Sequence, residues 1–261
     1  MRFENKKILI TGSSSGIGKE LAIAFAKEGA DIVVNYSHRK EEAEAIGEEI
    51  RKIGRDALVI KADVSKKAEV EAMVEEAWNY FGKIDVLVSN SGITTECSLL
   101  NLSEEKWNEI LGVNLNGTFF CDSAVARKMV KFGIKGHIIN ISSSNAFSVE
   151  VNRGAYNTSK GGVNLLTQSF AAELGRFGIH VNAVAYGSIS GTNIAGDLFK
   201  DSRNFMSTVI DKTPLGYIAV PSESVGPVMF LASEESSFVQ GEILKADGGI
   251  TIWKFNDELR G

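Results

Sequence analysis

The chain has 261 residues, 44% of them hydrophobic and 23% charged, which is enough to bury one sizeable core. A net charge of −5 and the lack of a long basic stripe argue against nucleic acid or an anionic membrane as a partner. No apolar run approaches the ~20 residues of a membrane span, and Met1 to Lys7 leave no room for a signal peptide before the first strand. Cys97 and Cys121 are isolated, which is typical of a reducing compartment, so we expect a cytoplasmic protein without a metal site.

Strand-like and helical patterns alternate along the chain. The strand-like runs cover residues 7–10, 31–35, 57–61, 86–89, 137–141, 179–184 and 243–246, and the helical patterns cover 17–28, 40–53, 66–81, 103–131, 155–177 and 223–232. This order predicts an α/β fold, a single-domain Rossmann-type doubly wound parallel sheet flanked by helices over residues 1–261. The polar stretch at about 193–212 follows a predicted strand end, where ligands bind in such sheets, so we expect a mobile substrate lid there.

The segment Thr11 to Gly18 joins the first strand to the first helix and contains glycines at 12, 16 and 18. Glycines permit a tight turn and a close backbone approach to a pyrophosphate, whose charge then lies at the positive helix N-terminus. The spacing lacks the Lys-Ser/Thr ending of a nucleoside-triphosphate loop, so ATP and GTP are disfavoured. The segment therefore predicts a dinucleotide site, with a plain glycine-rich turn as the alternative.

The end of the second strand indicates which dinucleotide is preferred. Sites for NAD usually place an acidic residue ~20 residues after the glycine loop, and that place holds Tyr36. Arg39 follows closely and could form a forked contact with a 2′-phosphate. The sequence thus favours NADP(H), with NAD(H) possible, unless Arg39 and Lys40 are only solvated loop charges.

A second pattern lies in the middle of the chain, where Tyr156 is followed four residues later by Lys160 and preceded by Ser143. The i, i+4 spacing puts Tyr156 and Lys160 on one helical face. A tyrosine titrates near ~10 and can act as an acid/base at neutral pH only if a nearby cation stabilises the phenolate. The pattern predicts a proton-transfer site, although a surface tyrosine stacked on a lysine stem would give the same spacing.

Together these segments resemble the short-chain dehydrogenase/reductase family over nearly the whole chain. Further segments match the family's motifs in order: Asp63-Val64, Ser89-Asn90-Ser91-Gly92, Asn114, Tyr186-Gly187, Thr192 and Asp247-Gly248-Gly249. Within these segments, Ser91 and Tyr186 depart from the family pattern. Tyr186 replaces a proline that would fix φ, so contacts near Gly187 and Ile189 are expected to be less secure.

The resemblance implies hydride transfer between a nicotinamide and a carbinol carbon, and it assigns four catalytic roles. Tyr156 is the acid/base, Ser143 holds the substrate oxygen, and Lys160 lowers the tyrosine pKa and binds the nicotinamide ribose. Asn114 anchors a water that leads protons to the lysine, unless it is only a helix asparagine. The cofactor-binding positions that the family pattern implies are Gly12, Ser14, Ser15, Gly16, Ile17, Gly18, Tyr36, Ser37, Arg39, Asp63, Val64, Asn90, Gly92, Tyr156, Lys160, Gly187, Ile189 and Thr192.

The substrate class stays open at this level. The motifs are similar to both the glucose 1-dehydrogenase and the 3-oxoacyl-thioester reductase branches, so a ketone, a 3-oxoacyl thioester or an aldose is expected as the small-molecule carbonyl or alcohol substrate. A non-catalytic dinucleotide sensor that kept the fold is the alternative, and the intact proton-transfer residues argue against it. The resemblance also implies a homotetramer.

Overall fold

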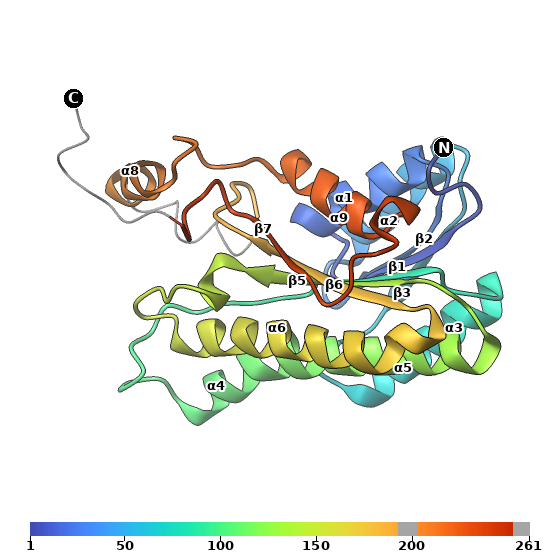
Figure 1. Ribbon diagram of the computed structural model, residues 1–261, viewed down its shortest axis with the longest axis horizontal. Coiled ribbons are helices and arrows are strands. Elements are labelled where there is room, and N and C mark those ends of the chain that lie inside the picture. The colour runs from blue at the N-terminus through green and yellow to red at the C-terminus, as the bar shows by residue number, and fades with distance from the viewer. Residues whose placement is uncertain (193–202, 253–261) are drawn as a thin grey trace.

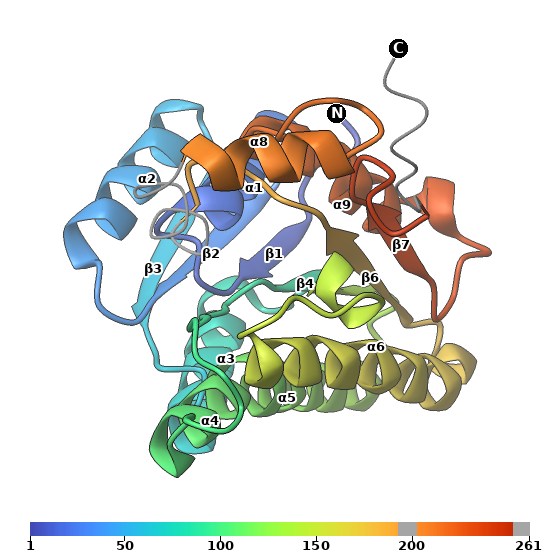
Figure 2. The same ribbon diagram turned by 90° about the vertical axis from the view of Figure 1, so that its left-hand side faces the viewer.

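Seven parallel strands form one sheet in the order β3-β2-β1-β4-β5-β6-β7 (Figures 1 and 2). The computed structural model describes residues 1–192 and 203–252. The strands are β1 (Lys7–Ile10), β2 (Asp31–Tyr36), β3 (Ala57–Lys61), β4 (Val86–Ser89), β5 (His137–Ser143), β6 (His180–Tyr186) and β7 (Ile243–Ala246). The predicted fold class is therefore confirmed, and the chain changes direction in the sheet between β1 and β4, where such folds bind ligands.

Helices cover both faces of the sheet, as Figure 1 shows. One face carries α1 (Gly16–Lys27), α2 (Lys40–Lys52) and α9 (Val225–Leu231), and the other carries α3 (Lys67–Phe81), α4 (Glu104–Leu111), α5 (Gly117–Phe132) and α6 (Gly154–Leu174). Successive strand residues point to opposite faces, so Ile8 and Ile10 join the core under the first set of helices and Leu9 joins the core under the second. No described helix is long and apolar enough to cross a membrane.

Two predicted segments differ from the structure. The single helix expected over 103–131 is divided by a π-helical segment, η1 (Gly112–Asn116), between α4 and α5. Within the predicted lid, residues 193–202 lie outside the described part of the chain, while α8 (Arg203–Lys212) is helical rather than unpatterned.

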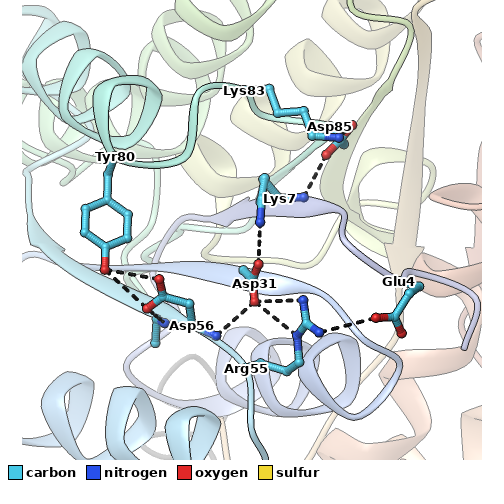
Figure 3. Close-up of polar contacts among 9 residues, drawn as sticks. Glu4, Lys7, Asp31, Arg55, Asp56, Tyr80, Lys83 and Asp85 are labelled. Carbon is cyan, nitrogen blue, oxygen red and sulfur yellow. Dashed lines mark hydrogen bonds and ion pairs between the residues drawn. The ribbon is translucent and has the colours of Figure 1, made fainter.

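Charged side chains close the amino-terminal edge of the sheet (Figure 3). The Asp31 carboxylate pairs with Lys7 and, at 3.0 Å, with Arg55. Asp85 accepts hydrogen bonds from the Lys7 backbone at 2.8 Å and from Lys83 Nζ at 2.9 Å. Because the glycine loop lies at the opposite, carboxyl-terminal edge, this cluster supports the fold without contacting the candidate site.

Candidate active site

Two different constraints explain the three glycines of the loop after β1. Gly12 and Gly16 have φ values of +62° and +55°, in the left-handed region that side chains disfavour. Gly18 has a different reason to be glycine, because a Cβ there would lie 2.6 Å from Gly12 O and 2.7 Å from Asn90 Nδ2. The loop thus needs two glycines for its turn and one for the packing of α1 against it.

Asn35 braces this loop from β2 and was not predicted. Its Oδ1 accepts from Gly12 N at 3.0 Å, its backbone N–H donates to Ser13 Oγ at 3.1 Å, and its Nδ2 donates to Ala62 O at 3.1 Å. The signal in the sequence is one asparagine directly after the apolar run from Ile32 to Val34.

A cavity of about 1450 Å³ opens at the carboxyl-terminal edge of the sheet. Its lining joins the glycine loop to the ends of β2, β3, β4, β5 and β6. It includes sixteen of the predicted cofactor-binding residues and Ser143: Gly12, Ser14, Ser15, Gly16, Ile17, Ser37, Arg39, Asp63, Val64, Asn90, Gly92, Tyr156, Lys160, Gly187, Ile189 and Thr192. Gly18, Tyr36 and Asn114 are the predicted site residues that do not line it.

Tyr36 lies in the hydrophobic core instead. Strand alternation puts its side chain on the same face as Ile32 and Val34, and it is 7% exposed. The Tyr36 side chain therefore points into the core, and its assignment as a cofactor-binding residue stays a prediction. The next residues Ser37 and His38, together with Arg39, line the cavity at this end, and Ser37 Oγ lies 3.0 Å from His38 Nδ1.

The opposite side of this end of the cavity is formed by Asp63. Its carboxylate accepts hydrogen bonds from Ser65 N at 3.0 Å and Ser65 Oγ at 2.7 Å. Partial burial alone would raise the pKa of Asp63, but these hydrogen bonds and the charge of Lys66 outweigh it and hold the pKa below its usual value. Asp63 therefore stays ionised, and it is fixed by its own turn.

Asn90 and Gly92 follow β4 and form the floor of the cavity. Asn90 Nδ2 donates to Thr11 O at 2.9 Å, which ties this turn to the glycine loop. A Cβ on Gly92 would lie 3.6 Å from Asn114 Oδ1 and 3.7 Å from Lys160 Nζ. Gly92 thus leaves the space between these two side chains open.

The candidate proton-transfer group, Tyr156, is 6% exposed and lies in the first turn of α6. Burial raises the pKa of Tyr156, while a hydrogen bond with Ser143 and the positive charge of Arg153 act in the opposite direction. Ser143 is placed by the end of β5, where it pairs in register with Tyr186 of β6. In this structure Arg153 is the cation that most opposes the increase in the Tyr156 pKa. The sequence instead predicted that Lys160 would lower this pKa.

Lys160 lies one helical turn further along α6 and is 3% exposed. Its Nζ donates to Ile141 O at 2.7 Å and lies 5.8 Å from the centre of the Tyr156 ring. Burial lowers the pKa of Lys160 to about 8, so the ammonium form still dominates at neutral pH. Lys160 and Tyr156 lie on one face of α6, as the i, i+4 spacing predicts. Burial, which the spacing does not reveal, makes Lys160 bind its proton less tightly.

Asn114 is fully buried inside the π-helical segment η1. Its Oδ1 accepts from Ile93 N at 2.8 Å, and its Nδ2 donates to Ile93 O at 2.9 Å and to Ser159 Oγ at 3.0 Å. Such π-helical turns occur often at functional sites. Asn114 therefore connects α6 to the turn after β4 from behind the cavity wall.

Tyr186 does not loosen the turn that follows β6. Its side chain is buried, its hydroxyl donates to Ser224 O, and its backbone pairs with Ser143 and Ala246 in the sheet. A Cβ on Gly187 would lie 3.0 Å from Asp247 O, so a side chain at this position would displace the Asp247 backbone slightly. The family pattern has a proline at position 186, whose ring would fix the backbone. In this chain the pairing of Tyr186 with Ser143 and Ala246 fixes it instead.

These features fit a dinucleotide. Glycines at 12 and 16 leave a bare backbone at the N-terminus of α1, where a pyrophosphate would bind. Polar groups for two riboses stand on either side, at Ser37 to Arg39 and at Tyr156 and Lys160. No group of three or more His, Cys, Asp or Glu in the described ranges could hold a metal ion.

Comparisons with known proteins find relatives over almost the whole chain. A family model described as enoyl-(acyl carrier protein) reductase matches residues 12–251. An L-rhamnose 1-dehydrogenase (NAD(P)(+)) of Sphingomonas is 37% identical, over 95% of this chain and 97% of its own. A 3-oxoacyl-[acyl-carrier-protein] reductase of Staphylococcus epidermidis is 36% identical over 94% and 99%, and a glucose 1-dehydrogenase of Bacillus subtilis is 36% identical over 95% of each chain.

A solved structure extends the likeness to the whole fold. The gluconate 5-dehydrogenase of Burkholderia cenocepacia, in complex with NADP and tartrate, superposes with a TM-score of 0.92. It is 36% identical, and the match covers 97% of this chain and 98% of that one. Both branches that the motifs resembled are thus found among similar proteins, and the chain belongs to the short-chain dehydrogenase/reductase family of oxidoreductases.

Proposed function

We propose that this chain interconverts a secondary alcohol and a carbonyl in a small molecule, with NAD(P)(H) as the hydride carrier and Tyr156 as the acid/base. The observation that carries the proposal is the buried phenol of Tyr156. It borders Ser143 and Lys160 inside a cavity whose other end is a bare glycine loop. A module that only binds a dinucleotide has no need of a buried proton-transfer group.

Three side chains divide the work at the reacting carbon. The nicotinamide, when bound, accepts a hydride in alcohol oxidation and donates one in carbonyl reduction. The Ser143 hydroxyl orients the substrate oxygen, and Tyr156 takes the hydroxyl proton during oxidation or returns it during reduction. The positive charge of Arg153 favours the phenolate that results and opposes the pKa increase caused by burial. We assign a second, similar contribution to the ammonium group of Lys160, whose Nζ lies 5.8 Å from the centre of the Tyr156 ring.

The proton then needs a route to solvent. Asn114 Oδ1 and Lys160 Nζ border the same space beside Gly92. A water held between them would accept a proton from Lys160 and begin that route. This arrangement supports the role of Asn114 as a positioning residue for proton transfer.

Arg39 supports NADP(H) as the preferred carrier, with NAD(H) also accepted. It is exposed at the rim of the cavity, beside Ser37 and His38, where a 2′-phosphate would lie. The similar proteins include one whose name gives both carriers and one whose structure contains NADP. Their names also include sugar and 3-oxoacyl substrates, so the likeness leaves the substrate open between an aldose or its relatives and a 3-oxoacyl thioester.

The surroundings of the site support two further expectations. Thr208, Val209 and Lys212 of α8 line the cavity, so α8 would cover the substrate as part of the lid. Exposed Phe119 on α5 and Leu165 on α6 provide apolar surface through which copies of this chain would assemble as a homotetramer. We expect the protein to act in the cytoplasm. A monomer in light scattering at micromolar concentration would reject the tetramer.

The test of function is turnover. NADPH oxidation and NADP⁺ reduction are measured with panels of ketones, 3-oxoacyl thioesters, aldoses and polyols, and each is repeated with NAD(H). We expect a change in absorbance at the nicotinamide band with at least one of these substrate classes. Tight cofactor binding without turnover of any of them would instead support a dinucleotide sensor.

A further inference from the structure

An ion pair between a buried arginine and a partly exposed glutamate lies in the cavity wall next to the proton-transfer group. Arg153 comes three residues before Tyr156, lines the cavity and is 5% exposed. Its Nε lies 3.3 Å from Glu150 Oε1, which is within ion-pair distance, but Nε forms no hydrogen bond with any described residue. A guanidinium nitrogen is thus buried at the substrate end of the cavity with its N–H unsatisfied.

The surrounding contacts hold this pair in place. Asn145 Nδ2 donates to Glu150 Oε2 at 3.1 Å, and Asn157 Nδ2 donates to the Glu150 backbone oxygen at 2.9 Å. The backbone next to Arg153 is anchored as well, because Cys97 N donates to Asn152 O at 2.7 Å. The pair is therefore fixed before any substrate arrives, as a recognition site requires.

The chemistry of the pair limits what can bind to it. An unsatisfied buried donor is costly, and a substrate oxygen that accepts from Arg153 would remove that cost. The neighbouring carboxylate of Glu150 already accepts from Asn145 Nδ2 and can accept a further hydrogen bond. A hydroxyl supplies both functions, and two adjacent hydroxyls can serve both partners at once. An acyl chain would leave the buried Arg153 Nε without an acceptor.

We propose that Glu150 and Arg153 bind hydroxyl groups adjacent to the reacting carbon, so the substrate is an uncharged polyhydroxylated compound rather than an acyl thioester. The inference rests on the proposed oxidoreductase function and names the substrate class of that same site. It assigns specificity to two residues that neither the motif pattern nor the glycine loop identifies.

The test compares two alcohols that differ by one hydroxyl. Oxidation of cyclohexane-1,2-diol and of cyclohexanol by the NADP⁺-loaded enzyme is measured for the wild type, Arg153→Lys and Glu150→Gln. Lysine keeps the positive charge near Tyr156 but loses the planar fork. Glu71→Gln, in the exposed pair of Lys67 and Glu71 on α3, is the matched control.

We expect the wild type to prefer the diol. The ratio of kcat/KM for diol over cyclohexanol should fall about ten- to a hundredfold in Arg153→Lys and about tenfold in Glu150→Gln, as expected for the loss of a charged hydrogen bond. The loss should appear in the KM for the diol more than in kcat, and NADPH affinity measured by fluorescence should not change. The Glu71→Gln ratio should equal that of the wild type.

Several outcomes would overturn the inference. A wild type that oxidises cyclohexanol at least as well as the diol, or variants that slow both alcohols equally, would reject the inference and leave the oxidoreductase function standing. If no alcohol or carbonyl is turned over, the proposed function falls and this inference falls with it. If thermal melting shows that Arg153→Lys does not fold, Glu150→Gln decides, because the Glu150 side chain is 35% exposed and tolerates the change.

Discussion

The phenol of Tyr156 has the most demanding environment of the site residues. It is buried beside Ser143, with a raised pKa, and its proton can leave only when nearby cations favour the phenolate. Tyr156→Phe removes the proton-transfer oxygen and leaves the glycine loop intact. We expect kcat/KM to fall by about 10²–10⁴-fold with unchanged NADPH affinity, measured by steady-state kinetics and fluorescence titration.

A matched control is available on α3. Tyr80 is half-exposed, and its hydroxyl donates to Asp56 at the far edge of the sheet. Tyr80→Phe should therefore keep wild-type kinetics. Near-normal turnover in Tyr156→Phe would exclude this residue as the acid/base.

Arg39 tests the cofactor preference. It lies at the cavity rim, and no described residue bonds its guanidinium, so it is available to a 2′-phosphate. A charged hydrogen bond contributes ~1.5–3 kcal/mol, so Arg39→Ala should weaken NADP(H) by roughly ten- to a hundredfold and leave NAD(H) nearly unchanged. The measurement is kcat/KM with each cofactor. Lys40→Ala, at the next residue and outside the cavity, is the control. Equal losses with NADP(H) and NAD(H) in Arg39→Ala would show that this charge does not contact the phosphate.

Site residues were predictable where chemistry and spacing act within a short segment. The Tyr156 and Lys160 pair follows from helical geometry, and the glycine positions follow from the backbone conformation that the loop needs. The burial of the Tyr36 side chain could not be predicted in this way, because counting residues from the glycine loop ignores the strand face on which a side chain emerges. Glu150 and Arg153 were missed, since their pairing depends on a loop path that no periodic pattern specifies.

At the scale of elements, a buried polar network ties four of them together. Asp122 of α5 accepts from Ser89 Oγ of β4 at 2.8 Å and from Asn140 Nδ2 of β5 at 2.9 Å. Asn140 Nδ2 also donates to Thr167 Oγ1 of α6, while its Oδ1 has no partner among the described residues. Burial raises the pKa of Asp122 to about 7 despite these hydrogen bonds.

This shift predicts a stability that depends on pH. The unfolded Asp122 ionises near 3.8 and the folded one near 7, so the unfolded state binds fewer protons in this window and stability falls as pH rises through it. The asparagine in Asp122→Asn cannot ionise. As pH rises from about 4 to 7, the free energy of unfolding of this variant should therefore increase relative to that of the wild type. Urea denaturation at several pH values measures the difference. A difference that does not vary with pH would mean that Asp122 titrates normally.

Elements themselves were predictable from their apolar runs, with errors where the residues are polar. β5 and β6 each extend two residues beyond the predicted ends, because Ser142 and Ser143 continue the ladder opposite Ala185 and Tyr186. The π-helical segment η1 was taken as ordinary helix, since hydrophobic periodicity does not reveal a change of hydrogen-bond register. Both errors lie at the candidate site, where function rather than packing selects the residues.

At the scale of the whole molecule, the candidate active site and the cluster of charged side chains around Asp31 lie at opposite edges of the sheet. The cavity opens at the carboxyl ends of the strands, and the cluster around Asp31 joins the amino ends of β1, β2 and β4 (Figure 3). This separation allows stability to change without a change in turnover. Asp31 is the center of the cluster, because Lys7, Arg55 and the Asp56 backbone all bond its carboxylate.

Asp31→Asn tests that separation. Burial alone would raise the pKa of Asp31, but the hydrogen bonds from Lys7 and Asp56 and the charges of Lys7 and Arg55 hold it below its usual value of 3.8. Its ionised form therefore contributes stability above about pH 4, and this contribution is lost as pH falls through the lowered pKa. We expect Asp31→Asn to reduce the free energy of unfolding by about 1–3 kcal/mol at pH 7, with the difference from the wild type shrinking toward pH 3. Because Asp31 lies at the far edge, kcat and KM of the folded variant should match those of the wild type, and Glu71→Gln should change neither quantity. A stability loss that persists undiminished at pH 3 would assign the effect to packing, and a loss of turnover in folded protein would mean that the two edges are coupled.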